Sequence, residues 1–291
     1  MATNQQRREA AKRKLERQLA RRSEQAKRRR IVGVGVTVGA VVVVAGLVVI
    51  LATRGDDSTA DGSDSAADSS ASASGPPSAP QEDVQIPTER VEPASRPEPL
   101  PNPTTCEYPE SGEAAKEVPA PDGENVSSEG TAKVTLHSEA GDIGLDLDRA
   151  LAPCTVNSFV HLAQEGYYTD TGCHRIGTQG LQMLQCGDPT GSGTGGPGYS
   201  FADETFDSLT YGRGVLAMAN SGPDTNGSQF FMVFGEAPLP PDYTVFGTID
   251  DAGLEVIDEI ARAGHDGSFD PSPGGGKPNT EVTFTDVTVD A

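Results

Sequence analysis

The run from Gly214 to Phe231 constrains the fold of this chain more than any other part of its sequence. It consists of an apolar stretch, a polar turn crowded with Gly, Asn and Pro, and a second stretch of aromatic and apolar residues. This order predicts two strands that pass each other closely beside a groove. Asn-Gly turns occur in many β-proteins, so the pattern alone predicts strands and defines no activity.

Further strands and two helices are predicted outside this run. Residues 133–137 and 141–147 alternate between apolar and polar side chains, and the Ser-Glu-Ala-Gly between them predicts a hairpin turn. Residues 153–165 and 254–263 place apolar side chains on one helical face, and a glycine follows each segment. The rest of the C-terminal half has the pattern of short strands and Gly-rich turns.

Charge divides the chain into two unlike parts. Residues 1–30 hold 12 basic and three acidic side chains, whereas the remaining 261 residues hold 10 basic and 40 acidic ones. The basic part is expected to be a cytoplasmic tail that sets membrane topology; binding to anionic lipid headgroups is the alternative role. The acidic part would repel phosphate groups, so we expect no nucleic-acid partner.

Residues 31–52 form an uncharged, mostly Val, Gly, Ala, Ile and Leu segment. At about 1.5 Å per residue these residues span roughly 33 Å, enough for a bilayer core of about 30 Å. A cleaved signal peptide would have a shorter apolar region of about 7–15 residues. We therefore expect a transmembrane signal anchor that crosses the cell membrane once, with the N-terminus in the cytoplasm and the rest of the chain outside it.

Three further parts follow the anchor. Residues 53–105 are rich in Ser, Ala, Asp and then Pro, which predicts a disordered linker, because so little apolar surface cannot offset the entropy of ordering. Residues 106–130 are intermediate in composition and are expected to lie as an extension on the surface of the folded domain. That domain is predicted to comprise residues 131–291.

The four cysteines all follow the predicted anchor. An even number of cysteines outside the cytoplasm favours disulfides over free thiols, and three pairings are possible. The sequence contains no Cys-x-x-Cys and no matched pair of histidines, so we expect no metal and no cofactor. The Gly-rich stretch 191–198 lacks the Lys-Ser/Thr ending of a phosphate-binding loop. The candidate disulfide residues are Cys106, Cys154, Cys173 and Cys186.

Three motifs indicate a family when they are taken together: His174-Arg175-Ile176, Gly187-Asp188-Pro189-Thr190 and the run from Gly214 to Phe231. They resemble the cyclophilins, which are peptidyl-prolyl cis-trans isomerases (rotamases). The resemblance covers about residues 131–290. It implies a mainly β fold, a closed eight-stranded antiparallel β-barrel capped by two helices. The anchor, linker and extension are similar to those of an actinobacterial member.

The expected chemistry needs no nucleophile or metal. Rotation about an X-Pro amide has a barrier of roughly 18–20 kcal/mol because resonance gives its C–N bond double-bond character. A donor to the prolyl nitrogen, an apolar slot for its ring and an anchor for the chain would lower that barrier. The resemblance implies that Arg175 is the catalytic donor and that Gln185 braces it and reaches the substrate carbonyl. Lysine lacks the planar, directed donors of arginine.

The resemblance also implies a substrate groove. Met183 and Phe231 match the floor of the proline pocket, although core packing is the alternative role for both. Gln182 departs from the family, since many relatives have Phe there, and His174 is expected to be structural. The implied substrate-binding residues are Met183, Gly193, Ala219, Asn220, Ser221, Gln229, Phe231, Leu239 and Tyr243.

The resemblance suggests one disulfide pairing. It places Cys173 and Cys186 on neighbouring antiparallel strands, which leaves Cys106 to join the extension to the start of the first helix at Cys154.

We therefore expect a membrane-anchored isomerase that acts on X-Pro bonds of unfolded or secreted polypeptides outside the cytoplasm and assists their folding. The family resemblance also implies possible binding of cyclosporin-type inhibitors. Acidic Glu236 and Asp242 near the groove favour basic clients. One alternative is a catalytically weak cyclophilin fold that binds proline-containing segments as an adaptor or holdase, and another is a structural envelope protein.

Overall fold

The computed structural model describes residues 84–92 and 94–290. The chain divides into two units, residues 1–75 and 76–291, and all described residues belong to the second. The predicted tail, the predicted anchor and most of the predicted linker lie outside the described residues. Within the described part, no helix is long and apolar enough to cross a bilayer.

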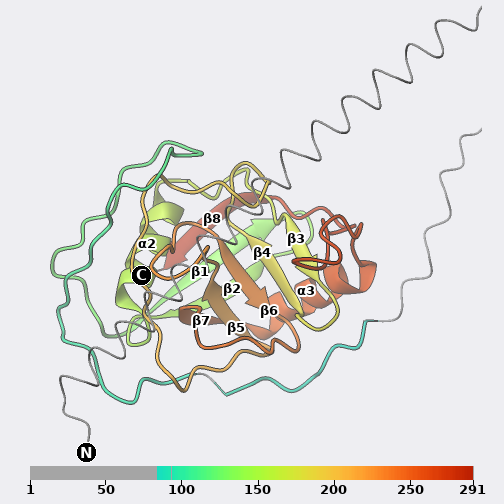
Figure 1. The fold of residues 1–291 in the computed structure, drawn as a ribbon, viewed down its shortest axis with the longest axis horizontal. Coiled ribbons are helices and arrows are strands. Elements are labelled where there is room, and N and C mark those ends of the chain that lie inside the picture. The colour runs from blue at the N-terminus through green and yellow to red at the C-terminus, as the bar shows by residue number, and fades with distance from the viewer. Residues whose placement is uncertain (1–83, 93, 291) are drawn as a thin grey trace, which may run out of the picture. The chain divides into compact units, whose positions relative to one another are not determined.

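Eight antiparallel strands form a single curled sheet in the order β3-β4-β6-β5-β7-β2-β1-β8 (Figure 1). The predicted hairpin is present as β1 and β2, and the run that begins at Gly214 forms β5 and β6. The strands are β1 (Thr131–Ser138), β2 (Ile143–Asp148), β3 (Arg175–Gly177), β4 (Met183–Cys186), β5 (Val215–Met218), β6 (Phe230–Val233), β7 (Val245–Ile249) and β8 (Phe284–Asp290).

The sheet is curled into a half-barrel. The prediction of a closed barrel is therefore wrong. Among the described residues, the edge strands β3 and β8 share no ladder, and the residues just before them make only local contacts. Gly172 bridges to Thr283, and the Cys173 N–H donates to the Val282 carbonyl at 2.9 Å. The physical reason is that β3 has only three residues, and Ile176 at its centre exchanges hydrogen bonds with Gly276 of a loop.

Two helices pack on the sheet, as predicted. Helix α2 (Pro153–Gln164) packs against β1, β2, β7 and β8, and helix α3 (Asp251–Ala263) packs against β2. Phe159 of α2 lies in the core, with ring centroids 4.9–5.3 Å from Tyr168, Phe230 and Phe246. Helix α3 begins three residues earlier than predicted because the Asp250 side chain caps it, accepting from the Gly253 N–H at 2.6 Å.

The end of the predicted linker is attached to the folded domain. Arg96 donates from Nε to the Leu151 carbonyl and from Nη2 to the Glu204 carbonyl, both at 2.7 Å. Arg90 donates to the Ile249 carbonyl at 2.6 Å, and the Val91 N–H donates to the Arg213 carbonyl at 3.1 Å. The prediction of a disordered linker through residue 105 therefore does not hold for these residues. Polar contacts hold Arg90, Val91 and Arg96 on the domain. The prediction of disorder rested on the low apolar content of the segment, which carries no information about such contacts.

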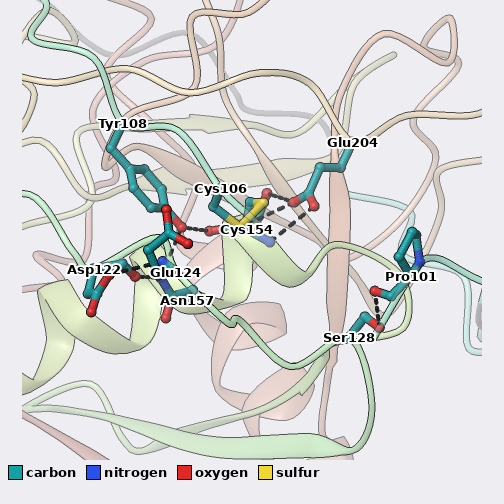
Figure 2. The surroundings of a disulfide bond; sticks show 10 residues. Pro101, Cys106, Tyr108, Asp122, Glu124, Ser128, Cys154, Asn157 and Glu204 are labelled. Carbon is teal, nitrogen blue, oxygen red and sulfur yellow. Dashed lines mark hydrogen bonds between the residues drawn. A yellow bond between two sulfur atoms is a disulfide. The ribbon is translucent and has the colours of Figure 1, made fainter. Parts of the chain in front are cut away.

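A disulfide fixes the extension, residues 106–130, to the folded domain. Cys106 is bonded to Cys154 at the start of α2 (Figure 2). The Tyr108 hydroxyl donates to the Cys154 carbonyl at 2.7 Å and accepts from Asn157 Nδ2 at 3.1 Å. The Glu204 carboxylate accepts from the Cys154 N–H at 3.0 Å, so it caps the helix next to the disulfide.

Candidate active site

Arg175, Gln185 and Phe231 form a row across three neighbouring strands. Arg175 is paired with Gln185 between β3 and β4, and Gln185 is paired with Phe231 between β4 and β6. Paired residues of antiparallel strands point to the same face of a sheet, and residues two apart on one strand do so as well. Met183 therefore shares this face. The opposite face holds the fully buried Ile176, Leu184 and Met232.

The Arg175 guanidinium is held from three sides. Its Nε donates to the Gly274 carbonyl and its Nη2 to the Pro273 carbonyl, both at 2.9 Å, while its Nη1 donates to Gln185 Oε1 at 3.4 Å. An arginine has five N–H donors, so one donor on each Nη atom is left for a ligand. Partial burial lowers the pKa of Arg175, an effect that nearby Tyr243 opposes, and the group stays charged at neutral pH.

The loop that holds Arg175 requires glycine at one position. Gly275 has a φ of +83°, and a Cβ there would lie 2.1 Å from the Ile176 carbonyl oxygen. This close approach brings the Pro273 and Gly274 carbonyls against the guanidinium. Sequence reasoning missed both residues, because they lie 98 and 99 positions from Arg175 and their backbone atoms make the contact. The only signal in the sequence is the Pro-Gly-Gly-Gly run itself.

A chain of side-chain amides orients Gln185. Its Oε1 accepts from Arg175, and its Nε2 donates to Gln229 Oε1 at 3.0 Å. Gln229 Nε2 in turn donates to the Gly195 carbonyl at 3.0 Å. The two glutamines therefore connect the arginine to the Gly-rich loop, as expected for residues that share one groove.

Asp188 organises the Gly-rich loop from beneath. Its fully buried carboxylate accepts from the N–H groups of Thr190 at 2.7 Å, Gly193 at 2.6 Å and Thr194 at 3.0 Å. Burial alone would raise the pKa of Asp188, but the hydrogen bonds from Thr190 and the loop backbone outweigh it and hold the pKa below its usual range. The loop is thereby fixed at the position where Gly193 borders the groove.

His174 lies beneath the same loop, consistent with the structural role expected for it. Its side chain is buried, and its ring lies 3.6 Å from the position a Cβ of Gly193 would take. Neither ring nitrogen has a hydrogen-bond partner among the described residues. Burial lowers the pKa of His174, so the ring is neutral at pH 7.

The predicted proline pocket is built around two aromatic rings. The rings of Phe231 and Tyr243 meet edge to face with centroids 5.7 Å apart. Tyr211 holds Tyr243 in place, because its hydroxyl donates to the Tyr243 carbonyl at 2.7 Å and accepts from the Tyr243 N–H at 3.0 Å. Leu239 is half-buried, whereas Met183 and Phe231 are buried and also pack in the core.

A cavity of about 430 Å³ lies at the side chains of Gln185 and Gln229, which line it. Its wall includes Ser111, Gly112 and Glu113 of the extension, which sequence reasoning did not place in the groove. No local pattern marks them, because their position depends on pairing with residues more than 80 positions away. Six of the predicted site residues line this cavity: Gln185, Gly193, Ala219, Asn220, Ser221 and Gln229.

Comparison with known proteins decides the family. The family of cyclophilin type peptidyl-prolyl cis-trans isomerases matches residues 132–289, more than half of the chain. The chain belongs to the cyclophilins. This cyclophilin is 48% identical over 200 residues to the "Probable peptidyl-prolyl cis-trans isomerase B" of Mycobacterium tuberculosis (strain H37Rv), and the match covers 64% of this chain and 64% of that relative.

A second mycobacterial relative matches along its whole length. The protein of the same description from Mycobacterium leprae is 45% identical over 306 residues, which cover 100% of both chains. Among solved structures, a cyclophilin type isomerase of Cryptosporidium parvum is 32% identical with a TM-score of 0.48, and the match covers 56% of this chain and 99% of that one. The expected likeness to actinobacterial members agrees with the two mycobacterial relatives.

The second disulfide of this cyclophilin lies beside the central row of the site. Cys173 is bonded to Cys186, with a Cα–Cα distance of 4.0 Å. Cys186 directly follows Gln185 in β4, and Cys173 lies two positions before Arg175, the first residue of β3, so the bond joins β4 to the segment that leads into β3. Both disulfide pairs agree with the pairing that the family resemblance implied.

The departure at Gln182 is explained by the N-terminal contacts of this cyclophilin. Gln182 is buried, donates from Nε2 to the Gln85 carbonyl at 2.8 Å and accepts from the Glu236 N–H at 2.8 Å. A phenylalanine could make neither hydrogen bond.

Within the part of the chain that the structure describes, no group of side chains is arranged to hold a metal ion.

Proposed function

We propose that this cyclophilin is anchored in the cell membrane by residues 31–52 and isomerises X-Pro bonds of unfolded or secreted polypeptides outside the cytoplasm. The site supports the reaction through one observation above all. Arg175 is held by three hydrogen bonds on the same face of the sheet as Phe231 and Met183, and it keeps two N–H donors for a ligand. A fixed cation above an apolar floor is what rotation about a prolyl amide requires.

The proposed mechanism relies on binding the twisted amide better than the planar one. In the planar amide, the nitrogen lone pair is shared with the carbonyl and accepts no hydrogen bond. As the bond twists, the lone pair localises on the nitrogen and accepts from a free Nη donor of Arg175. Gln185, oriented by Gln229, holds the substrate carbonyl while the other side turns. Only interactions that strengthen in the transition state accelerate the reaction.

The proposed location is supported by the disulfides and by the uncharged segment 31–52. All four cysteines are paired, and disulfides persist in oxidising compartments outside the cytoplasm. Segment 31–52 is long enough to span a bilayer, with the basic residues on the side that the positive-inside rule assigns to the cytoplasm. Proline-containing polypeptides that pass through this compartment are the proposed substrates.

The isomerase reaction is tested with the full-length protein in detergent and a short proline peptide in a protease-coupled assay. We expect acceleration by the wild type and a loss of about two to three orders of magnitude in kcat/KM for Arg175→Ala. The alternative, a module that binds proline segments without catalysis, predicts equal and negligible acceleration by both proteins while peptide binding is retained.

The location is tested in intact cells. Protease added outside should degrade an epitope at the C-terminus and leave an epitope at the N-terminus intact, and washing with high salt should leave the protein in the membrane fraction. Deletion of residues 1–54 should abolish membrane retention without lowering kcat/KM of the purified protein. Protection of the C-terminal epitope in intact cells would contradict the proposal.

A further inference from the structure

The extension adds a strand-like segment to the rim of the cavity that Gln185 and Gln229 line. The Ser111 N–H donates to the Gly198 carbonyl at 2.8 Å, and the Ala115 N–H donates to the Gly196 carbonyl at 2.9 Å. Glu110 bridges Tyr199 in antiparallel orientation. Residues 109–115 therefore run beside residues 196–200 and form part of the wall of the cavity.

This segment is fixed at both of its ends. The disulfide between Cys106 and Cys154 holds its start, as Figure 2 shows. At its other end, the Lys116 ammonium donates to the carbonyls of Gly166 at 2.7 Å, Tyr167 at 3.1 Å and Thr169 at 3.0 Å. Backbone pairing between two fixed ends gives residues 111–113 a defined position against the cavity.

Glu113 is the only charged side chain among the described residues that line this cavity. It is exposed, and within the described part of the chain it makes no ion pair. The nearest basic residue of the extension, Lys116, is occupied by its three carbonyls. Asp188, buried under the Gly-rich loop, and Arg175, which donates to Gln185, lie behind the lining and carry opposite charges. Glu113 therefore gives the lining of the cavity its net negative charge.

The cavity is continuous with the catalytic groove because the two share side chains. Gln185, which accepts from Arg175, also lines the cavity, together with Gln229 and Ala219. An extended chain advances about 3.3–3.6 Å per residue, so the residues within three positions of the proline cover roughly 10–11 Å on either side of it. A volume of about 430 Å³ accommodates one long side chain.

We propose that Glu113 is a specificity-determining residue, which makes this cyclophilin favour substrates with Lys or Arg within three positions of the isomerised proline. The proposal rests on the isomerase function proposed above and extends it to the substrate class. The carboxylate attracts the cationic end of the side chain, and the neutral amides and hydroxyls around it accept or donate the remaining hydrogen bonds. An acidic side chain at the same position is disfavoured by repulsion.

The test uses the full-length protein in detergent and a series of proline peptides. Lys, Ala or Glu is placed in turn at each of the three positions before and after the proline, and kcat/KM is measured for each peptide. At one position we expect the Lys peptide to exceed the Ala peptide by about two- to five-fold, the range typical of exposed ion pairs. This preference should shrink as ionic strength rises.

Variants at Glu113 test whether its carboxylate causes the preference for Lys. Glu113→Gln should remove the preference, so that the Lys and Ala peptides are isomerised with equal kcat/KM, and Glu113→Lys should reverse the preference in favour of Glu. Glu117→Gln is the matched control, because Glu117 is an exposed acidic residue of the same extension that does not line the cavity. It should leave the preference intact.

The outcomes separate this proposal from the proposed function. If the wild type isomerises the Ala peptide but no position favours Lys, or if Glu117→Gln removes the preference as fully as Glu113→Gln does, the assignment of Glu113 is overturned. If the wild type does not accelerate even the Ala peptide, the isomerase function itself fails.

Discussion

Arg175 is held through three different nitrogen atoms, and this geometry makes charge alone insufficient. A lysine at the same position could not donate simultaneously to Gly274, Pro273 and Gln185 and still present a directed donor to the substrate. We expect Arg175→Lys to lower kcat/KM by about two orders of magnitude, mostly in kcat, because the lost interaction strengthens only in the transition state. The protease-coupled peptide assay measures this change.

Arg175→Ala and thermal unfolding are the controls for that experiment. The lysine variant should still unfold cooperatively, at a somewhat lower temperature than the wild type, because it loses part of the hydrogen bonding to Gly274, Pro273 and Gln185. Activity of Arg175→Lys within a few-fold of the wild type would show that positive charge suffices and that the planar donors are not used.

The contribution of Asp188 to the stability of the loop beside the groove depends on pH. Its folded-state pKa is held below the usual value of about 3.9 by hydrogen bonds from the loop, so its contribution to stability is fully present above that value. The contribution is lost as pH falls through the lowered pKa. We expect Asp188→Asn to reduce the free energy of unfolding by roughly 1.5–3 kcal/mol at pH 7.

The difference between wild type and Asp188→Asn isolates this group, because every other carboxylate titrates in both proteins. Urea unfolding at pH 7, 5, 4 and 3 should show the difference narrowing toward the acidic end. A difference that stays constant over this range would show that the charge of Asp188 does not stabilise the loop.

At the scale of elements, the two disulfides hold different parts of the chain in place. The bond between Cys106 and Cys154 closes a separation of 48 residues and fixes the extension, whereas the bond between Cys173 and Cys186 lies next to Arg175 and Gln185. Replacing Cys106 and Cys154 by alanine should lower the free energy of unfolding by about 2–4 kcal/mol and leave kcat for a neutral peptide unchanged. Replacing Cys173 and Cys186 should also lower kcat, because β3 and β4 lose a constraint beside Arg175 and Gln185.

Urea unfolding and the peptide assay on the two double variants test this division. Each variant serves as the matched control of the other, since each lacks one disulfide. Equal kcat values for the two variants would contradict a special role for the bond next to Arg175 and Gln185.

The elements differ in how far the sequence predicts them. Period-two alternation locates β1 and β2, and helical spacing locates α2 and α3, because a buried face repeats along each element. The row of Arg175, Gln185 and Phe231 follows from the local motifs of the family. The carbonyls of Pro273 and Gly274 and the wall at Glu113 do not, since backbone groups of distant segments make these contacts and leave no periodic pattern.

At the scale of the whole molecule, the folded domain depends on residues that precede its first strand. Arg90, Arg96 and Lys116 donate to carbonyls of the domain, and Cys106 binds Cys154. The sequence predicts a domain that begins at residue 131, because the period-two alternation of the first strands begins there. The structure shows contacts that begin in the segment 84–92, so the stable unit is longer than the family match over residues 132–289.

Three fragments measure what these residues contribute: 84–291, 106–291 and 131–291, the last with Cys154→Ser to avoid a free thiol. The first should match the full-length protein in unfolding midpoint and kcat/KM. The second keeps the disulfide but loses Arg90 and Arg96, so its midpoint in urea should be lower. The third also loses the disulfide, worth about 2–4 kcal/mol, and should be the least stable.

Because Arg175 and Gln185 are retained in all three fragments, kcat for a neutral peptide should persist wherever the fragment is folded. Equal midpoints for 84–291 and 131–291 would show that the preceding segments lie on the domain without stabilising it.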